Sequence, residues 1–131
     1  MAARQSSRGS GESLPREERL RRRADFRRCY RRGRRRQGSL VALYAVPGEA
    51  PESHPRLGVT VSRKVGGSVV RSRTKRRIRE IYRRWNERGS LPPLDLVVHA
   101  KPAAGRAHFA ALEAELTRLL RSLLAPKTQE S

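Results

Sequence analysis

The sequence has only one cysteine, Cys29, among its 131 residues. A single cysteine excludes an internal disulfide framework and a metal site made of several cysteines, and it fits a reducing cytoplasm. No stretch approaches the roughly 18 uninterrupted apolar residues of a membrane span, and the N-terminus lacks the apolar core of a signal peptide. We therefore expect a cytoplasmic protein that has no membrane partner.

Acidic residues are also scarce. The chain has 12 Asp and Glu against 31 Lys and Arg, which gives a formal charge of +19 and a pI of about 11.8. The acids form no pair placed for general acid–base catalysis, and the three histidines lack metal-ligand spacing. We expect no catalytic side chain, no metal bound by the protein and no small-molecule substrate. The expected partner is a polyanion.

Large apolar residues are limited too. Leucine, isoleucine, valine and phenylalanine together number 27, about 21 per cent of the chain, close to the ~20 per cent below which charged chains tend to stay disordered. The length and composition predict one domain with a small core. We expect residues 1–15 to be a disordered N-terminal extension, residues 16–125 the folded domain, and residues 126–131 a flexible tail.

The positive charge is concentrated in two segments. Residues 16–36 contain 12 arginines, and residues 71–88 contain eight arginines and Lys75. A charge run can be a solvated surface, but such a surface usually carries both signs and more lysine. Guanidinium groups match phosphate oxygens in bidentate geometry and stack on bases. The two segments therefore favour a surface that binds nucleic acid.

Hydrophobic periodicity predicts the element order α-β-β-α-β-α, an α+β two-layer sandwich. The expected helices lie in the later part of 16–32, from Ser68 as a possible cap to Trp85, and in 109–123. The expected strands are 40–46 and 57–62, joined by a proline-containing loop as an antiparallel pair, and 96–98. In the middle helix an apolar stripe leaves the remaining arc to arginines; the stripe consists of Ile78, Ile81, Tyr82 and Trp85.

Aromatic side chains are few, and three of them are predicted to lie together. Phe26 and Tyr30 share one face of the first helix, and Tyr44 lies on the strand face opposite Val41 and Leu43. A cleft between that helix and that strand face could stack unpaired bases. For Phe26, packing in the core is the default interpretation. Cys29 is expected to be a small buried hydrophobe rather than a nucleophile.

The central part of the chain, residues 56–84, has the sequence RLGVTVSRKVGGSVVRSRTKRRIREIYRR. This run resembles the signature region of the protein component of bacterial ribonuclease P. There a strand ending in Ser-Lys/Arg-Lys leads through Val-Gly into a helix with Arg-Asn-Arg-x-x-Lys-Arg-x-x-Arg-Glu. Further similarities are Ala24-Asp25-Phe26 with Tyr30 and Gly33, the strand around Leu43-Tyr44, residues 95–98 followed by Ala100-Lys101-Pro102, and the C-terminal leucine helix.

The resemblance covers residues 20–124, and the chain departs from the family at two places inside the signature. Ser72 stands where the family has Asn, and Gly67-Ser68 stands where it usually has Lys-Ala. Serine can still hydrogen-bond a phosphate, but it lacks the second polar group of the amide. Arg71 and Arg73, on either side, match the family.

The resemblance implies a fold in which helices pack on a small mixed sheet and the arginine-rich helix forms a left-handed β-α-β crossover. General handedness rules alone would predict a right-handed crossover. It also implies a subunit of an RNA endonuclease. The protein would assist a catalytic RNA subunit, which binds Mg²⁺ and removes the 5′ leader from precursor tRNA. The implied partners are that RNA and precursor tRNA.

By position, the resemblance also implies two groups of site residues. The implied RNA-binding residues are Arg71, Ser72, Arg73, Lys75, Arg76, Arg79, Arg63 and Lys64. The implied 5′-leader cleft contains Phe26, Tyr30, Tyr44 and Ser62.

Two other functions fit the composition. A structural ribosomal protein would carry the same charge, and a helix-based DNA regulator would also use an arginine-rich helix. The regulator would need a second helix joined to the first by a tight turn, whereas predicted strands flank the arginine-rich helix here.

A charge of +19 around a small core predicts that the free protein is only partly folded at low ionic strength, because its cations repel one another. Sulfate or a polyanion should complete folding by binding the native state in preference to the unfolded state. Circular dichroism in dilute buffer, before and after addition of sulfate, measures the expected gain in helical signal. A cooperative thermal transition that is the same with and without the anion would contradict this prediction.

Overall fold

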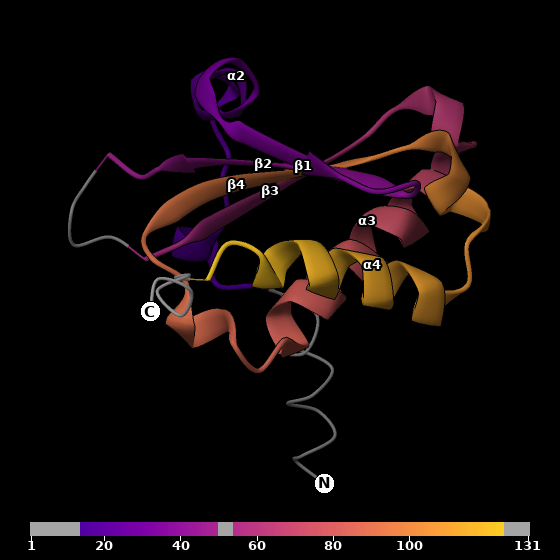
Figure 1. The fold of residues 1–131 in the computed structure, drawn as a ribbon. Helices are drawn as coiled ribbons and strands as arrows, with labels where there is room; N and C mark the ends of the chain where they lie inside the picture. Colours follow the sequence, from indigo (N-terminus) through magenta and orange to yellow (C-terminus); the bar gives the residue numbers. More distant parts are fainter. Residues whose placement is uncertain (1–13, 50–53, 125–131) are drawn as a thin grey trace, which may run out of the picture.

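The computed structural model describes residues 14–49 and 54–124 (Figure 1). Its helices are α2 (Arg23–Arg32), α3 (Ser68–Arg84) and α4 (Phe109–Arg121), and its strands are β1 (Arg34–Gln37), β2 (Val41–Pro47), β3 (Arg56–Val61) and β4 (Leu94–Ala100). Four short 3₁₀ turns complete the order: η1 (Arg16–Glu18), η2 (Arg63–Val65), η3 (Arg88–Ser90) and η4 (Pro102–Arg106). Residues 1–13 of the predicted extension, and the predicted tail at 126–131, lie outside the described residues.

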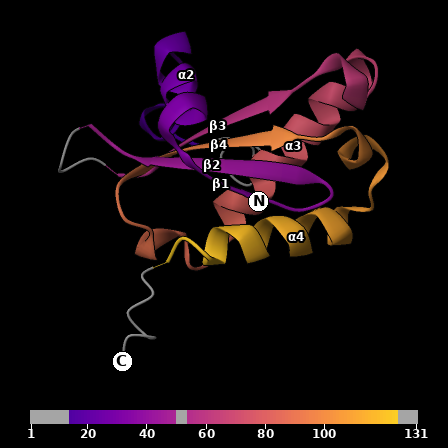
Figure 2. The ribbon, with the colours of Figure 1, turned by 45° about the horizontal axis from the view of Figure 1, so that its top comes forward.

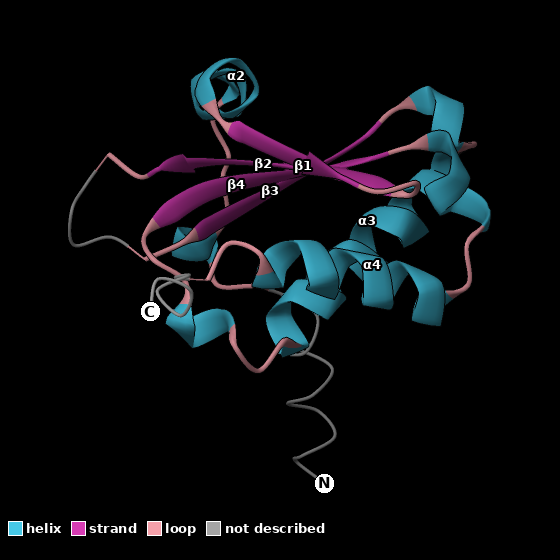
Figure 3. Ribbon diagram, viewed as in Figure 1, coloured by secondary structure: helices cyan, strands magenta, loops and turns pink. Residues whose placement is uncertain are grey.

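The four strands form one mixed sheet in the order β1-β2-β4-β3, which is the middle layer of the molecule (Figure 3). β4 pairs antiparallel with β2 and parallel with β3. The prediction that 40–46 and 57–62 pair with each other is therefore wrong. The cause lies in β4, whose residues Leu96, Val97 and Val98 are each 0% exposed. A strand that is apolar on both faces takes a central place in the sheet, between the other two.

Helices cover both faces of the sheet. α2 lies alone on one face, and α3 and α4 lie on the other (Figures 1 and 2). The predicted α+β class, with helices on a small mixed sheet, is confirmed, and α2 adds a third layer to the predicted two. β3 and β4 are parallel neighbours connected through α3, so the implied β-α-β unit is present. The left-handed sense of this crossover remains an expectation that rests on the resemblance.

The main core lies between the sheet and the pair α3 and α4. The predicted apolar stripe of α3 faces this core, because Ile78, Ile81, Tyr82 and Trp85 are all buried. One side of α4 completes it with Leu112, Leu116, Leu119 and Leu120. Leu14 also belongs to it and is 2% exposed, although it lies in the predicted disordered extension.

Strand β1 is an element that the sequence pattern did not predict. Its residues, RRRQ, show no alternation of polar and apolar side chains, and it pairs only with β2 at the sheet edge. The turn that follows is fixed by Glu115 of α4. Its carboxylate accepts hydrogen bonds from the backbone N–H groups of Leu40 at 2.8 Å and Val41 at 2.9 Å. This contact ties the β1–β2 hairpin to α4.

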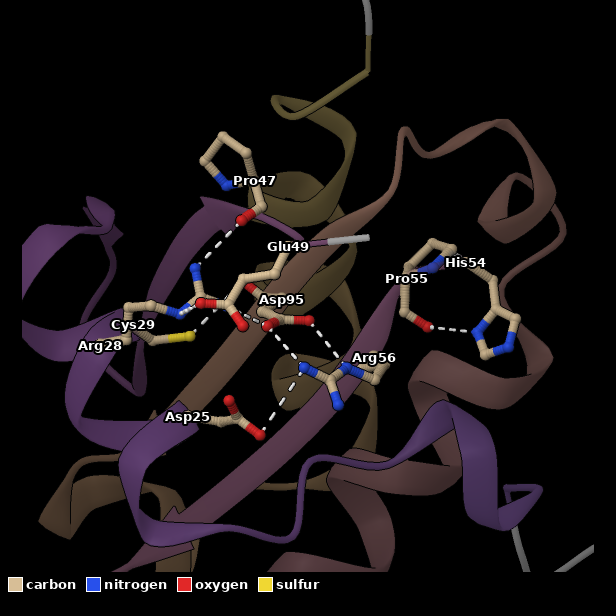
Figure 4. Close-up of polar contacts among 9 residues, drawn as sticks. All are labelled: Asp25, Arg28, Cys29, Pro47, Glu49, His54, Pro55, Arg56 and Asp95. Atoms are coloured by element: carbon tan, nitrogen blue, oxygen red, sulfur yellow. Dashed lines mark hydrogen bonds and ion pairs between the residues drawn. The ribbon is translucent and has the colours of Figure 1, made fainter. Parts of the chain in front are cut away.

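A buried carboxylate, Asp95 of β4, attaches α2 to the sheet (Figure 4). Asp95 is 1% exposed and accepts hydrogen bonds from Arg56 Nε at 2.9 Å and Arg56 Nη2 at 2.8 Å. It also accepts one from Nη2 of Arg28, which comes from α2. Cys29 is next to Arg28 and is 0% exposed, and burial raises the pKa of its thiol to about 11. The expectation that Cys29 is a buried hydrophobe is confirmed.

Replacing Asp95 with asparagine should lower the free energy of unfolding by about 3 kcal/mol, because removing one member of a buried ion pair leaves its partner's charge uncompensated. Urea unfolding in a sulfate-containing buffer measures the change. Glu80→Gln is the matched control: Glu80 pairs with Arg83 at 2.8 Å on the partly exposed side of α3, and its loss should cost less than about 1 kcal/mol. Equal losses from the two substitutions would contradict a special role for Asp95.

Candidate nucleic-acid interface

The sheet surface beside α2 presents a group of side chains that we call the tyrosine face: Tyr30, Tyr44, Thr60 and His99. The strand register brings three of them together, because β4 lies between β2 and β3 and His99 is opposite Thr60. Tyr30 reaches this surface from α2 and is 39% exposed. Its ring meets Tyr44 edge-on, with the ring centroids 4.7 Å apart. The predicted neighbourhood of Tyr30 and Tyr44 is confirmed.

A short hydrogen-bond chain orders the tyrosine face. The Tyr30 hydroxyl lies 2.7 Å from Thr60 Oγ1, which lies 2.9 Å from Nδ1 of His99. Burial raises the pKa of Tyr30, and burial together with the charge of Lys101 lowers the pKa of His99. Both rings are therefore neutral at neutral pH. A neutral, partly exposed aromatic surface of this kind suits the stacking of unpaired bases.

Phe26 lies deeper than the two tyrosines. It is half-buried and packs in a second, smaller core with Leu20 and Cys29, between α2 and the sheet. A Cβ atom at Gly58 would lie 2.5 Å from Cζ of Phe26, so the ring fits only because this residue of β3 has no side chain. Phe26 thus supports α2 beneath the tyrosine face, in agreement with the core interpretation. Its contact with a leader stays a prediction.

The residues after β3 connect the tyrosine face to α3. Ser62 follows β3 with an extended backbone, φ −80° and ψ 167°, and so continues the alternation that places Thr60 on the tyrosine face. Arg63 and Lys64 then begin η2, and all three side chains are exposed. Two cations therefore border the tyrosine face on its α3 side.

The N-terminus of α3 has no side-chain cap. The prediction that Ser68 caps this helix is wrong, because Gly67 occupies the N-cap position and Ser68 is the first helical residue. Gly66, just before, has a φ of 153°, a conformation that favours glycine. The first N–H groups of a helix have no partner within it, and they carry the positive end of its dipole. This end of α3 is therefore electrostatically suited to phosphate.

Three of the implied RNA-binding residues come together near this end of α3. Arg71, Ser72 and Lys75 line one pocket of about 180 Å³. Arg76 follows Lys75, is exposed, and has no ion pair within residues 14–49 and 54–124. Arg71 and Lys75 are half-buried and reach this pocket, whereas Ser72 and Arg76 are exposed.

Two other implied residues of α3, Arg73 and Arg79, do not line this pocket. Arg73 is half-buried, and its Nη2 donates a hydrogen bond to the backbone oxygen of Gly105 at 3.3 Å. This bond fastens α3 to η4. Arg79 is also half-buried, and burial together with the nearby charge of Arg19 lowers its pKa. Both arginines therefore have a packing environment that the sequence alone did not indicate.

Strand β1 brings further residues to the tyrosine face, and the sequence pattern did not single them out. Arg35 lies opposite Tyr44 in the β1–β2 pair, and its guanidinium carbon is 5.9 Å from the Tyr44 ring centroid. This distance is typical of a cation–π contact. Gln37 accepts a hydrogen bond from Nζ of Lys101, which follows β4. In the sequence, Gly38-Ser39 separates the polar run 34–37 from the apolar run 40–46. This pair was the signal from which the β1–β2 hairpin could have been predicted.

Comparisons with known sequences identify one family. A family model described as Ribonuclease P matches residues 14–124. The chain is 45% identical over 113 residues to the ribonuclease P protein component of Desulfovibrio desulfuricans, with 84% of this chain and 85% of that protein covered. It is 41% identical over 119 residues to that of Acidothermus cellulolyticus, with 89% and 97% covered.

Solved structures have the same fold. The ribonuclease P protein of Staphylococcus aureus aligns with a TM-score of 0.73 at 27% identity, covering 82% of this chain and 98% of that chain. The protein from Thermotoga maritima gives a TM-score of 0.70 at 29% identity, covering 82% and 99%. The sheet, the helices on its two faces and sequence alignments over most of the chain thus point to one set of relatives, and the chain belongs to the ribonuclease P protein family.

Proposed function

We propose that the chain works through two surfaces: α3 binds the RNA subunit of ribonuclease P, and the tyrosine face binds the single-stranded 5′ leader of precursor tRNA. Family membership supplies the wider context. The chain is the protein subunit of ribonuclease P, an RNA endonuclease, and assists the RNA in processing the 5′ end of precursor tRNA. Membership favours this function over the structural ribosomal protein and the DNA regulator.

The observation that supports the proposal best is the chemical difference between two connected surfaces. The tyrosine face offers neutral rings and hydrogen-bonding groups, whereas Arg71, Lys75 and Arg76 offer cations. Bases stack on aromatic rings and phosphates bind guanidinium groups, so each surface suits a different part of an RNA. Arg63 and Lys64 lie between them and can follow a phosphate backbone from one surface to the other. In the α3 pocket the Ser72 hydroxyl can donate a hydrogen bond to phosphate.

We assign the hydrolytic step, and the Mg²⁺ that it needs, mainly to the RNA subunit. Within the described residues, no three side chains of His, Cys, Asp or Glu gather in a group that could hold a metal ion. The most buried carboxylate, Asp95, is bound by Arg28 and Arg56 and offers no free ligand. The described residues thus offer no carboxylate cluster to which the Mg²⁺ could be assigned, and its assignment to the RNA subunit rests on the family.

We also propose that the protein acts in the cytoplasm. The buried, unpaired Cys29 is compatible with a reducing compartment. No helix in the described part of the chain is long and apolar enough to cross a membrane.

Replacing Arg76 with alanine should weaken binding to the RNA subunit. The side chain is exposed, so the substitution removes one cation with little loss of packing. If Arg76 neutralises one phosphate, the slope of log K against log salt concentration should flatten by about one unit. Filter binding over a salt series measures this slope. Arg118→Ala, which removes an exposed cation from α4, is the matched control and should leave the slope unchanged. A wild-type slope for Arg76→Ala would exclude the phosphate contact.

Replacing Tyr30 with leucine should weaken binding of leader-bearing precursor tRNA to the holoenzyme by roughly tenfold, because stacking contributes ~1–3 kcal/mol per base. Binding of mature tRNA should change little. Tyr30→Phe is the matched control: it keeps the ring and loses only the hydroxyl with its contacts to Thr60 and His99, so it should retain most of the affinity. Circular dichroism checks that both variants fold. The stacking role is excluded if both variants lose the same affinity, or if Tyr30→Leu weakens both tRNAs equally.

A further inference from the structure

The side chain of Gln37, at the end of β1, is held by two cations. Its Oε1 accepts a hydrogen bond from Arg35 Nη2 at 2.8 Å and another from Lys101 Nζ at 2.7 Å. Lys101 Nζ is fixed in turn by a second bond, to the backbone oxygen of Gly38 at 2.7 Å. An amide oxygen has two lone pairs, so both acceptor positions of Gln37 are filled.

These two bonds determine how the amide is oriented. A cationic donor requires an acceptor, so the group that faces Arg35 and Lys101 must be the oxygen and not the NH₂. The NH₂ group is therefore turned away from both cations. Within the described part of the chain the hydrogen bonds of the Gln37 side chain are those on its oxygen, and the residue is exposed. Gln37 thus presents two N–H donors with a fixed direction.

The strand register places this amide on the same side of the sheet as the tyrosine face. Gln37 lies opposite Ala42 of β2, Ala42 lies opposite His99 of β4, and His99 lies opposite Thr60 of β3. Directly opposite residues project to one face, so these four side chains form a row across the sheet. Tyr44 is two residues from Ala42 and lies in the next row on that face, opposite Arg35. A base stacked at the tyrosines would therefore have the Gln37 amide beside it.

Gln37 and the two cations that hold it, Arg35 and Lys101, suit different parts of an RNA. Arg35 uses one N–H group on Gln37 and keeps other donors, so a phosphate beside β1 would bind this cation in preference to a neutral amide. The amide NH₂ matches the ring nitrogens and carbonyl oxygens along the edge of a base, and such contacts carry sequence information in RNA.

We infer that Gln37 is a specificity-determining residue of ribonuclease P: its NH₂ group donates a hydrogen bond to the base edge of one leader nucleotide. Arg35 and Lys101 are positioning residues that hold the amide in the orientation required. The inference rests on the proposed binding of the leader at the tyrosine face, and it adds that this binding depends on base identity.

The substitution Gln37→Glu tests this assignment. Glutamate has the same shape and keeps an oxygen for Arg35 and Lys101, but it replaces the NH₂ group with a second acceptor. The holoenzyme is titrated with precursor tRNAs that carry each of the four bases in turn at each leader nucleotide near the cleavage site. At one leader position, the wild type should bind the preferred base with roughly fivefold higher affinity than the least favoured base. A factor of this size is typical of one neutral hydrogen bond. In Gln37→Glu that ratio should fall to about one or invert.

Arg34→Ala is the matched control for charge. Arg34 is an exposed residue of β1 that lies opposite Ala45, on the other face of the sheet from Gln37. The substitution Arg34→Ala lowers the net charge by one, as Gln37→Glu does. It should weaken the binding of all leaders alike without changing the ratio of affinities between bases. Thermal unfolding in sulfate checks that both variants are folded.

The outcomes separate this inference from the function on which it rests. If the wild-type holoenzyme binds precursor and mature tRNA equally, the proposed leader site is wrong. If it prefers the precursor but shows no base dependence, or if Gln37→Glu keeps the wild-type ratio, only the role of Gln37 is overturned. The same holds if Arg34→Ala removes the base ratio as fully as Gln37→Glu does.

Discussion

The attachment of α2 to the sheet depends on the ion pairs of Asp95. Arg28 comes from α2 and Arg56 from β3, and both guanidinium groups meet this one carboxylate of β4, which is 1% exposed. In a chain with a formal charge of +19, an arginine-rich helix would otherwise be repelled by the rest of the molecule. α2 also carries Tyr30, so the distance from this ring to Tyr44 is set by the same contact. Asp95 therefore connects the stability of the fold with the geometry of the proposed leader site.

The arginines divide into those that the fold satisfies and those that it leaves available. Arg73 bonds to the backbone of η4, and Arg28 bonds to Asp95, so these cations serve the structure. Arg63 and Arg76 are exposed, without an ion pair among the described residues, and their mutual repulsion opposes folding. An RNA that neutralises the exposed cations relieves this repulsion and releases counterions at the same time. RNA binding and completion of the fold are thus expected to reinforce each other, because the bound RNA reduces the repulsion between cations that opposes folding.

The parts of the structure that follow from local pattern could be predicted from the sequence. The apolar stripe of α3 repeats over several helical turns, and the strand alternation correctly placed Tyr44 on the face opposite Leu43. Features that depend on distant residues could not be predicted. Asp95 and Glu115 meet partners 39 to 76 positions away, and no local period encodes such pairs. β1 was missed because an edge strand gains its backbone bonds from β2 and needs no apolar face, and with it the environment of Gln37 was missed too.

The two proposed surfaces lie on opposite sides of the sheet, and β3 is the element that relates them. Thr60 belongs to the tyrosine face beside α2, whereas the chain after Ser62 leads through η2 into α3 on the other side. β3 is an edge strand, paired with β4 along its length and anchored by the buried residues Leu57 and Val59. Because β3 runs from Thr60 directly to the turn before α3, it sets the distance between the aromatic surface and the cationic one. If α3 is held by the RNA subunit, a leader on the tyrosine face is positioned relative to that RNA by a single short strand. Such positioning aligns a substrate with a catalytic centre that lies outside the protein and requires no catalytic side chain within it.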